Sequence, residues 1–167
     1  MDRKSYVEEI PSWEEEEAPA IDVQIAPDYA GLLSEEWLRR IAQGVLDAEG
    51  VPGQVAVVVT DDDGIRELNR DFVGIDEPTD VLSFSAQEEA EGFVAAPEVA
   101  EYLGDVIVSF PRAAAQAKEA GHPVDEEVAL LVIHGLLHLL GYDHADDGGR
   151  ALMWARQDAL LARIKPG

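Results

Sequence analysis

The chain has no cysteine among its 167 residues, which excludes disulfide bonds and thiolate metal ligands. Any metal site would therefore have to use histidine, aspartate or glutamate side chains. No run of apolar residues reaches the length of a membrane span, and the polar, acidic N-terminus is unlike a secretory signal peptide. The sequence therefore predicts a cytoplasmic protein with no membrane partner, whose length suits a single domain with one core.

Positive charge is also scarce, because 12 lysines and arginines face 35 acidic residues and give a net charge of −23. Residues 1–20 carry seven acidic and two basic residues, and the remainder of the chain still has a net charge of −18. This charge has the wrong sign for attracting a phosphate backbone. An acidic surface with few lysines suggests a salt-rich cytoplasm, where screening shortens repulsion. A lineage bias in base composition predicts the same surface.

Residues 1–20 contain an acidic run and two prolines, a composition that predicts a disordered tail. Residues 21–167 are the predicted folded domain. Hydrophobic periodicity predicts strands at 21–25, 54–60, 80–84 and 103–109, and helices at 35–49, 61–72, 111–120, 124–140 and 149–164. Leu152, Ala159 and Leu160 are expected among the buried positions of the last helix. This order predicts an α+β fold with one small mixed sheet of about four strands packed with helices.

Residues 134–144, with the sequence HGLLHLLGYDH, contain three of the four histidines. His134 and His138 would lie one turn apart on the same face of a helix. Gly141 suits the end of that helix, and the chain can then return His144 toward the pair. Three imidazoles with an open fourth position are typical of catalytic zinc. A pair of hydrogen-bonded core histidines is the alternative, but the third histidine favours one zinc ion per chain.

The same histidine spacing occurs in metzincin metalloproteases, which carry a general-base glutamate directly after the first histidine. This chain has Gly135 at that position. A metalloprotease is therefore an alternative that lacks its positioned base. A zinc-bound water and a polarised phosphoryl oxygen would instead suit hydrolysis of a phosphodiester.

The sequence also resembles the bacterial YbeY family of zinc-dependent endoribonucleases, also called rRNA maturation factors. Residues 134–144 match the family motif His-Gly-x-Leu-His-x-x-Gly-Tyr-Asp-His throughout. Two further family blocks are present, Thr-Asp-Val-Leu-Ser-Phe at 79–84 and Leu-Gly-Asp with a β-branched run at 103–109. With Leu68-Asn69 before them and Met153 after them, the resemblance covers about residues 54 to 160 in the family's order. It implies a sheet of roughly four strands with the metal-bearing helix at its centre.

The resemblance implies a single-strand-specific endoribonuclease that acts in small-subunit ribosomal RNA maturation and in ribosome quality control. Its expected partners are single-stranded or ribosomal RNA and proteins of the small ribosomal subunit, with no role for DNA. A catalytically weak ribosome-assembly factor with a structural zinc is a further alternative. The negative charge of this chain favours that alternative more strongly than the charge of an average family member would.

Three other side chains are candidates for the chemistry. Asp105 leads into the apolar run at residues 106–108 and is the predicted general base, with a structural hydrogen bond as its alternative role. The family usually has arginine after the aromatic residue of its Leu-Asn-x-x-aromatic stretch, whereas this chain has Val73 there. Arg70 and Arg66, close together on one helical face, are predicted to contact phosphate instead. The alternative is that both are ordinary surface charges.

Overall fold

The computed structural model describes residues 21–86, 102–142 and 146–164. The predicted tail, residues 1–20, lies outside the described residues, and so does His144. No helix within the described ranges is both long and apolar enough to cross a membrane.

The described strands form one sheet in the order β1-β2-β4-β3. Strands β1 (Ile21–Ile25), β2 (Gln54–Thr60) and β4 (Tyr102–Ser109) are parallel, and β3 (Val81–Ser85) runs antiparallel to β4 at the edge. The β-branched runs of β2 and β4 suit the two central, buried positions of the sheet. The predicted α+β fold with a mixed four-stranded sheet is therefore confirmed.

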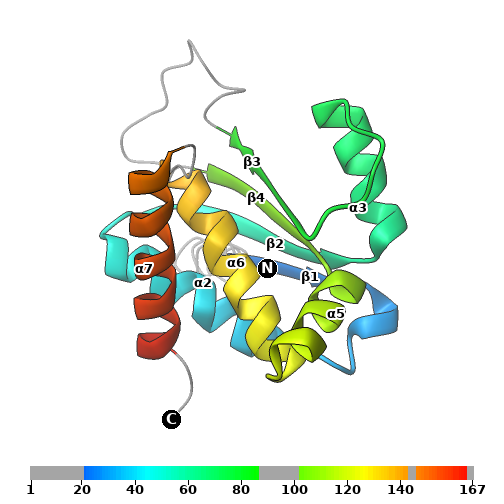
Figure 1. The fold of residues 1–167 in the computed structure, drawn as a ribbon, viewed down its shortest axis with the longest axis horizontal. Helices are drawn as coiled ribbons and strands as arrows, with labels where there is room; N and C mark the ends of the chain where they lie inside the picture. The colour runs from blue at the N-terminus through cyan, green and yellow to red at the C-terminus, as the bar shows by residue number, and fades with distance from the viewer. Residues whose placement is uncertain (1–20, 87–101, 143–145, 165–167) are drawn as a thin grey trace, which may run out of the picture.

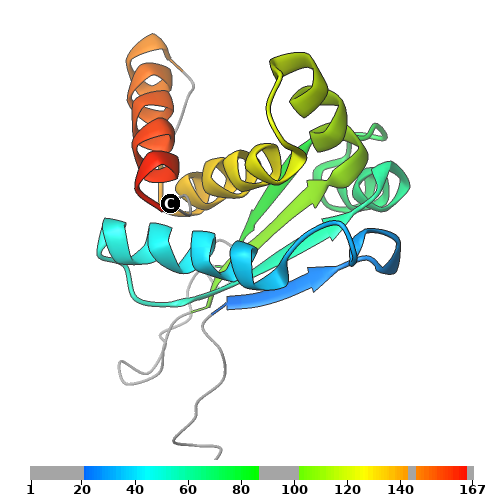
Figure 2. The same ribbon diagram turned by 90° about the horizontal axis from the view of Figure 1, so that it is seen from below.

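Four helices lie on one side of this sheet (Figure 2). They are α2 (Glu35–Glu49), α5 (Phe110–Ala120), α6 (Val124–Leu139) and α7 (Asp147–Ile164). The hydroxyl of Ser34 accepts a hydrogen bond from the Trp37 amide at 3.0 Å and caps α2. Because α6 is apolar on all sides, it is buried between the sheet and the other three helices (Figure 1). The predicted central helix is thus in place.

The prediction of one helix over residues 61–72 was only partly right. Helix α3 (Asp62–Leu68) continues into a π-helical turn, η2 (Asn69–Val73), which ends at Gly74. The Asn69 side chain donates a hydrogen bond to the Glu77 carbonyl at 2.9 Å and is buried. This contact ties the π turn to the loop before β3, because the widened turn brings Asn69 against that loop.

The buried face of α7 was predicted only in part, because Leu160 is buried as expected but the other two predicted positions are not. Met153, Gln157 and Leu160 are buried, whereas Leu152 is 61% exposed and Ala159 is exposed. The buried residues are spaced by four and three positions, so they share one face of the helix. Leu152 and Ala159 each precede one of them by one residue and point about 100° away from that face. The helix therefore packs with a polar side chain, Gln157, inside an apolar stripe.

Candidate metal centre

A cleft of about 470 Å³ lies between edge strand β3 and the C-terminal half of α6. The two predicted helix ligands, His134 and His138, both line it, with ring centroids 4.8 Å apart and planes inclined at 76°. The remaining lining residues are Asp80, Val81, Leu82, Ser83, Ser85 and Leu139. The four-residue spacing thus places both imidazoles at one cleft, as the sequence predicts. His144 lies outside the described residues, so its role as the third ligand stays a prediction.

Gln157 orients the first histidine of the pair. The Nδ1 atom of His134 lies 3.0 Å from Oε1 of Gln157, which is only 4% exposed. A carbonyl oxygen can only accept, so Nδ1 carries the proton and the lone pair of the ring resides on Nε2. A metal-binding histidine is commonly held in this way by an acceptor on its other nitrogen.

These features fit a zinc ion bound by imidazoles. The ring orientation of His134 is fixed, His138 lies beside it, and the cleft wall carries hydroxyl and carboxylate groups. Within residues 21–86, 102–142 and 146–164, no three histidine, aspartate or glutamate side chains come together as a complete metal site. A third protein ligand would therefore come from outside these ranges, where the predicted ligand His144 lies.

Gly135 explains why the helix can lie so close to the sheet. A Cβ atom at this position would lie 2.6 Å from Cγ1 of Val106 and 3.0 Å from Oγ of Ser83. The Ser83 hydroxyl donates a hydrogen bond to the Gly135 carbonyl at 2.9 Å. Position 135 thus faces the sheet, and a glutamate side chain there would collide with β4 instead of reaching the cleft. The protease alternative loses its base for a geometric reason as well as a chemical one.

A carboxylate that is largely covered anchors the chain just before the predicted third ligand. Glu49, at the end of α2, accepts hydrogen bonds from the Tyr142 hydroxyl at 2.9 Å and from Arg156 Nε at 2.5 Å. The Glu49 side chain is 12% exposed. Burial, followed by the hydrogen bond to Glu49, raises the pKa of Tyr142 and keeps its hydroxyl protonated. This network joins α2 and α7 to the residue two positions before His144.

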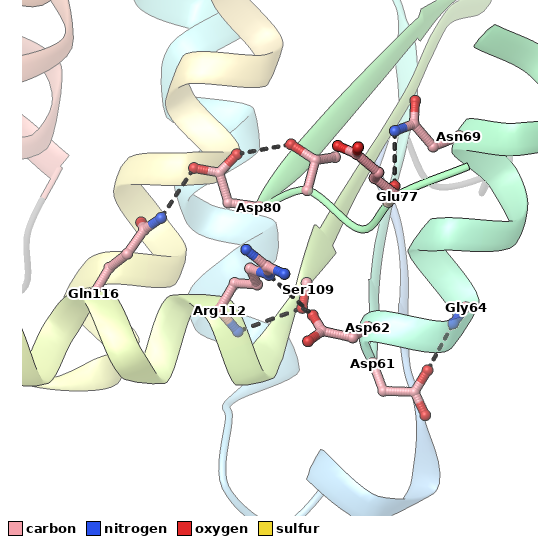
Figure 3. A network of polar contacts seen from close by, with 10 residues as sticks. Asp61, Asp62, Gly64, Asn69, Glu77, Asp80, Ser109, Arg112 and Gln116 are labelled. Atoms are coloured by element: carbon pink, nitrogen blue, oxygen red, sulfur yellow. Dashed lines mark hydrogen bonds and ion pairs between the residues drawn. The ribbon is translucent and has the colours of Figure 1, made fainter. Parts of the chain in front are cut away.

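Asp80 is the one carboxylate residue among the described residues that line the cleft. Gln116 Nε2 donates to its Oδ2 at 3.1 Å, and the Thr79 hydroxyl donates to its Oδ1 at 3.4 Å (Figure 3). The backbone carbonyl of Asp80 accepts from the Ser109 amide at 2.9 Å. Asp80 is therefore held by α5 and β4 at the mouth of the cleft.

Asp105 is not brought to the histidine pair. Val106 faces α6, because a Cβ on Gly135 would touch it, and side chains alternate along a strand. Asp105 therefore points to the opposite face of the sheet, where the Tyr102 hydroxyl donates a hydrogen bond to it. Its predicted role as general base is untested, and this position argues against that role. The structural alternative, a hydrogen-bonded strand residue, describes what is seen.

The two candidate arginines lie on α3 and η2. We call these two elements and the three residues that follow them the arginine arm (residues 62–76). Arg66 binds Asp76 with Nε at 2.7 Å and Nη2 at 3.3 Å, and this pairing lowers the pKa of the Asp76 carboxyl. Arg70 Nε lies 3.0 Å from Asp71 Oδ1. Both arginine side chains are 49% exposed, and neither lines the cleft. Their predicted contact with phosphate is untested and would compete with these carboxylates.

Three residues of the polar contacts described above were missed by sequence reasoning. Gln157 could have been found as the one polar residue in the apolar stripe of α7 if the buried positions of that helix had been assigned correctly. Glu49 and Arg156 carry no comparable signal, because they meet only through the packing of α2 against α7.

Comparison with known proteins gives a consistent family. The model of the family described as "Endoribonuclease YbeY" matches residues 23–165. A protein named endoribonuclease YbeY from Moorella thermoacetica is 49% identical over 131 residues, covering 76% of this chain and 84% of its own. The protein of that name from Chloroflexus aggregans is 46% identical, covering 86% and 95%. The solution structure of TM1509 from Thermotoga maritima aligns with a TM-score of 0.60 and 28% identity, covering 86% and 88%.

Proposed function

This chain belongs to the endoribonuclease YbeY family, and we propose that it is a zinc-dependent endoribonuclease that cuts single-stranded RNA during maturation of small-subunit ribosomal RNA. The same proposal holds that the protein acts in ribosome quality control, contacts proteins of the small ribosomal subunit and works in the cytoplasm. The observation that carries the zinc dependence is the pair of imidazoles at one cleft, with one ring oriented by Gln157.

His134, His138 and His144 would hold the zinc. When bound there, zinc lowers the pKa of a water molecule and polarises a phosphoryl oxygen. The chain's own residues supply the setting for this chemistry. Gln157 keeps His134 in the tautomer that presents Nε2, and Ser83 fastens edge strand β3 to α6. Since β3 is an edge strand beside the cleft, a single RNA strand can lie along it.

One observation favours the second candidate, a ribosome-assembly factor with a structural zinc. The described cleft lining has no lysine or arginine, and both arginines of the arginine arm pair with carboxylates. Phosphodiester cleavage places negative charge on the non-bridging oxygens, and cations usually stabilise it. A chain without a cation at this point would bind zinc and turn over slowly.

The test is zinc analysis combined with cleavage of a single-stranded RNA by wild type and His138→Ala. We expect one zinc per wild-type chain and metal-dependent cleavage, and loss of both in the variant. His122→Ala is the matched control, because His122 lies in the turn between α5 and α6, where it contacts Glu127, and does not line the cleft.

Three results would contradict the nuclease. Cleavage by zinc-free His138→Ala would show that the metal is not required for the reaction. Bound zinc without RNA cleavage would support the assembly factor. Zinc-dependent hydrolysis of casein that disappears in His138→Ala would support the protease.

A further inference from the structure

Trp154 presents a large apolar ring to solvent beside the histidine pair. It lies on α7 and is 53% exposed, whereas its neighbours on the buried face, Met153 and Gln157, are almost fully covered. Tryptophan is among the most extensively buried residue types, and Trp37 in α2 is only 8% exposed. Leaving so much apolar area in water is unfavourable. The exposed indole is therefore a candidate contact for a ligand.

The position of Trp154 links it to the cleft. It precedes Gln157 by three residues, so the two side chains are neighbours on α7, and Gln157 contacts His134. The centroid of a Trp154 ring lies 6.5 Å from that of His134. The ring planes are tilted by 48° and are not stacked face to face. An extended strand whose phosphate reaches the histidines would therefore pass its bases close to the indole.

Charge leaves few other ways to hold RNA at this place. The chain carries −23, and the described lining of the cleft has one carboxylate, Asp80, and no cationic side chain. Attraction to the phosphate backbone is correspondingly weak. Stacking of a base on an aromatic ring does not depend on charge, and proteins that bind single strands use it widely. Paired bases inside a duplex cannot stack in this way without unpairing.

We propose that Trp154 stacks on one nucleobase of the single-stranded RNA and so positions the strand at the histidine cleft. This proposal rests on the proposed function and adds a substrate-positioning residue to it. Trp154 strengthens the binding of RNA and makes the site prefer single strands to duplexes. It takes no part in holding the metal.

The experiment measures binding of a fluorescein-labelled, 2′-O-methylated oligoadenylate, which resists cleavage, to the zinc-loaded full chain. Trp154→Ala should weaken binding about five- to hundredfold, and Trp154→Phe should recover most of that loss. Leu152→Ala is the matched control, because Leu152 is 61% exposed on the same helix but points elsewhere, and it should bind like wild type. Zinc content is determined for every variant and should stay at the wild-type level.

Abasic substitution identifies the stacked base. A single abasic nucleotide moved along the oligonucleotide should weaken binding at one position for wild type, and this position effect should vanish in Trp154→Ala. Stacking on the indole should also quench the tryptophan fluorescence of the wild-type protein more than that of Trp154→Phe. Equal binding by wild type and Trp154→Ala, or an equal loss in Leu152→Ala, overturns the proposal.

Failure of the stacking contact and failure of the proposed function give different results. If wild type cleaves RNA and Trp154→Ala binds and cleaves like it, only the stacking contact is wrong. If wild type neither binds nor cleaves single-stranded RNA, the proposed function is wrong and the stacking proposal is rejected with it.

Discussion

The histidine cleft and the arginine arm are held in opposite ways. Across the cleft, contacts join residues that are distant in sequence: Gln157 and His134 are separated by 23 positions, and Ser83 and Gly135 by 52. In the arm, Arg70 pairs with its immediate neighbour, and both arginine pairs are exposed. Long-range contacts change only when packed elements move, whereas exposed ion pairs exchange readily with solvent or a ligand. The cleft is thus preorganised, and the arm is adaptable.

The largest expected effect comes from removing the orienting contact in the cleft. Gln157→Leu leaves Nδ1 of His134 without its acceptor, so zinc affinity should fall about 10- to 100-fold. Competition with a zinc chelator measures this change. Gln157→Glu keeps an acceptor oxygen and should retain most of the affinity. Unchanged affinity in Gln157→Leu would mean that the cleft is no more preorganised than the arm.

Overpacking the helix–sheet contact should have the next largest effect. Gly135→Ala places a methyl group 2.6 Å from Val106, and this should lower the free energy of unfolding by about 1–3 kcal/mol. Gly31→Ala is the control, because a Cβ there meets nothing within 4 Å. Urea denaturation of the two variants compares them. Equal stability would show that α6 can shift away from the sheet, contrary to a rigid cleft.

The arginine arm should show smaller effects on catalysis. Arg70→Ala should lower single-turnover cleavage by about tenfold while zinc stays bound, because one guanidinium fewer can approach the phosphate. Arg66→Ala should have less effect, since two hydrogen bonds already commit Arg66 to Asp76. Val73→Arg adds an exposed guanidinium at the end of η2 and should restore part of the loss. If Arg66→Ala, Arg70→Ala and the double variant all cleave like wild type, the arm has no role in phosphate contact.

The smallest effect concerns pH. Arg66 lowers the pKa of Asp76 in the folded chain, so the folded state binds this proton less readily than the unfolded state. The ion pair therefore stabilises the fold above the pKa of the unfolded carboxyl, about 3.9, and this contribution is lost as pH falls through the lowered pKa of the folded state. Asp76→Asn should make the melting temperature slightly less sensitive to acid in this range. A steeper acid dependence in the variant would contradict this sign.

Much of the fold could be predicted because local patterns encode it. The alternating Ile21, Val23 and Ile25 form β1, and Ser34 and Gly50 cap the two ends of α2. The π turn after Leu68 was not predicted, because it depends on a contact between Asn69 and the loop at Glu77. Leu152 was placed on the wrong face of α7, since the helix has no strongly one-sided apolar pattern.

The shared face of His134 and His138 and the glycine at position 135 can be read from the sequence, because a helix fixes which residues share a face. Long-range packing, in contrast, brings Gln157 to His134 and Glu49 to Tyr142, and it turns Asp105 away from α6. Strand alternation separates Asp105 from Val106, but it does not say which face a helix will cover. That choice follows from the packing of the whole core, where every element competes for the same apolar surface.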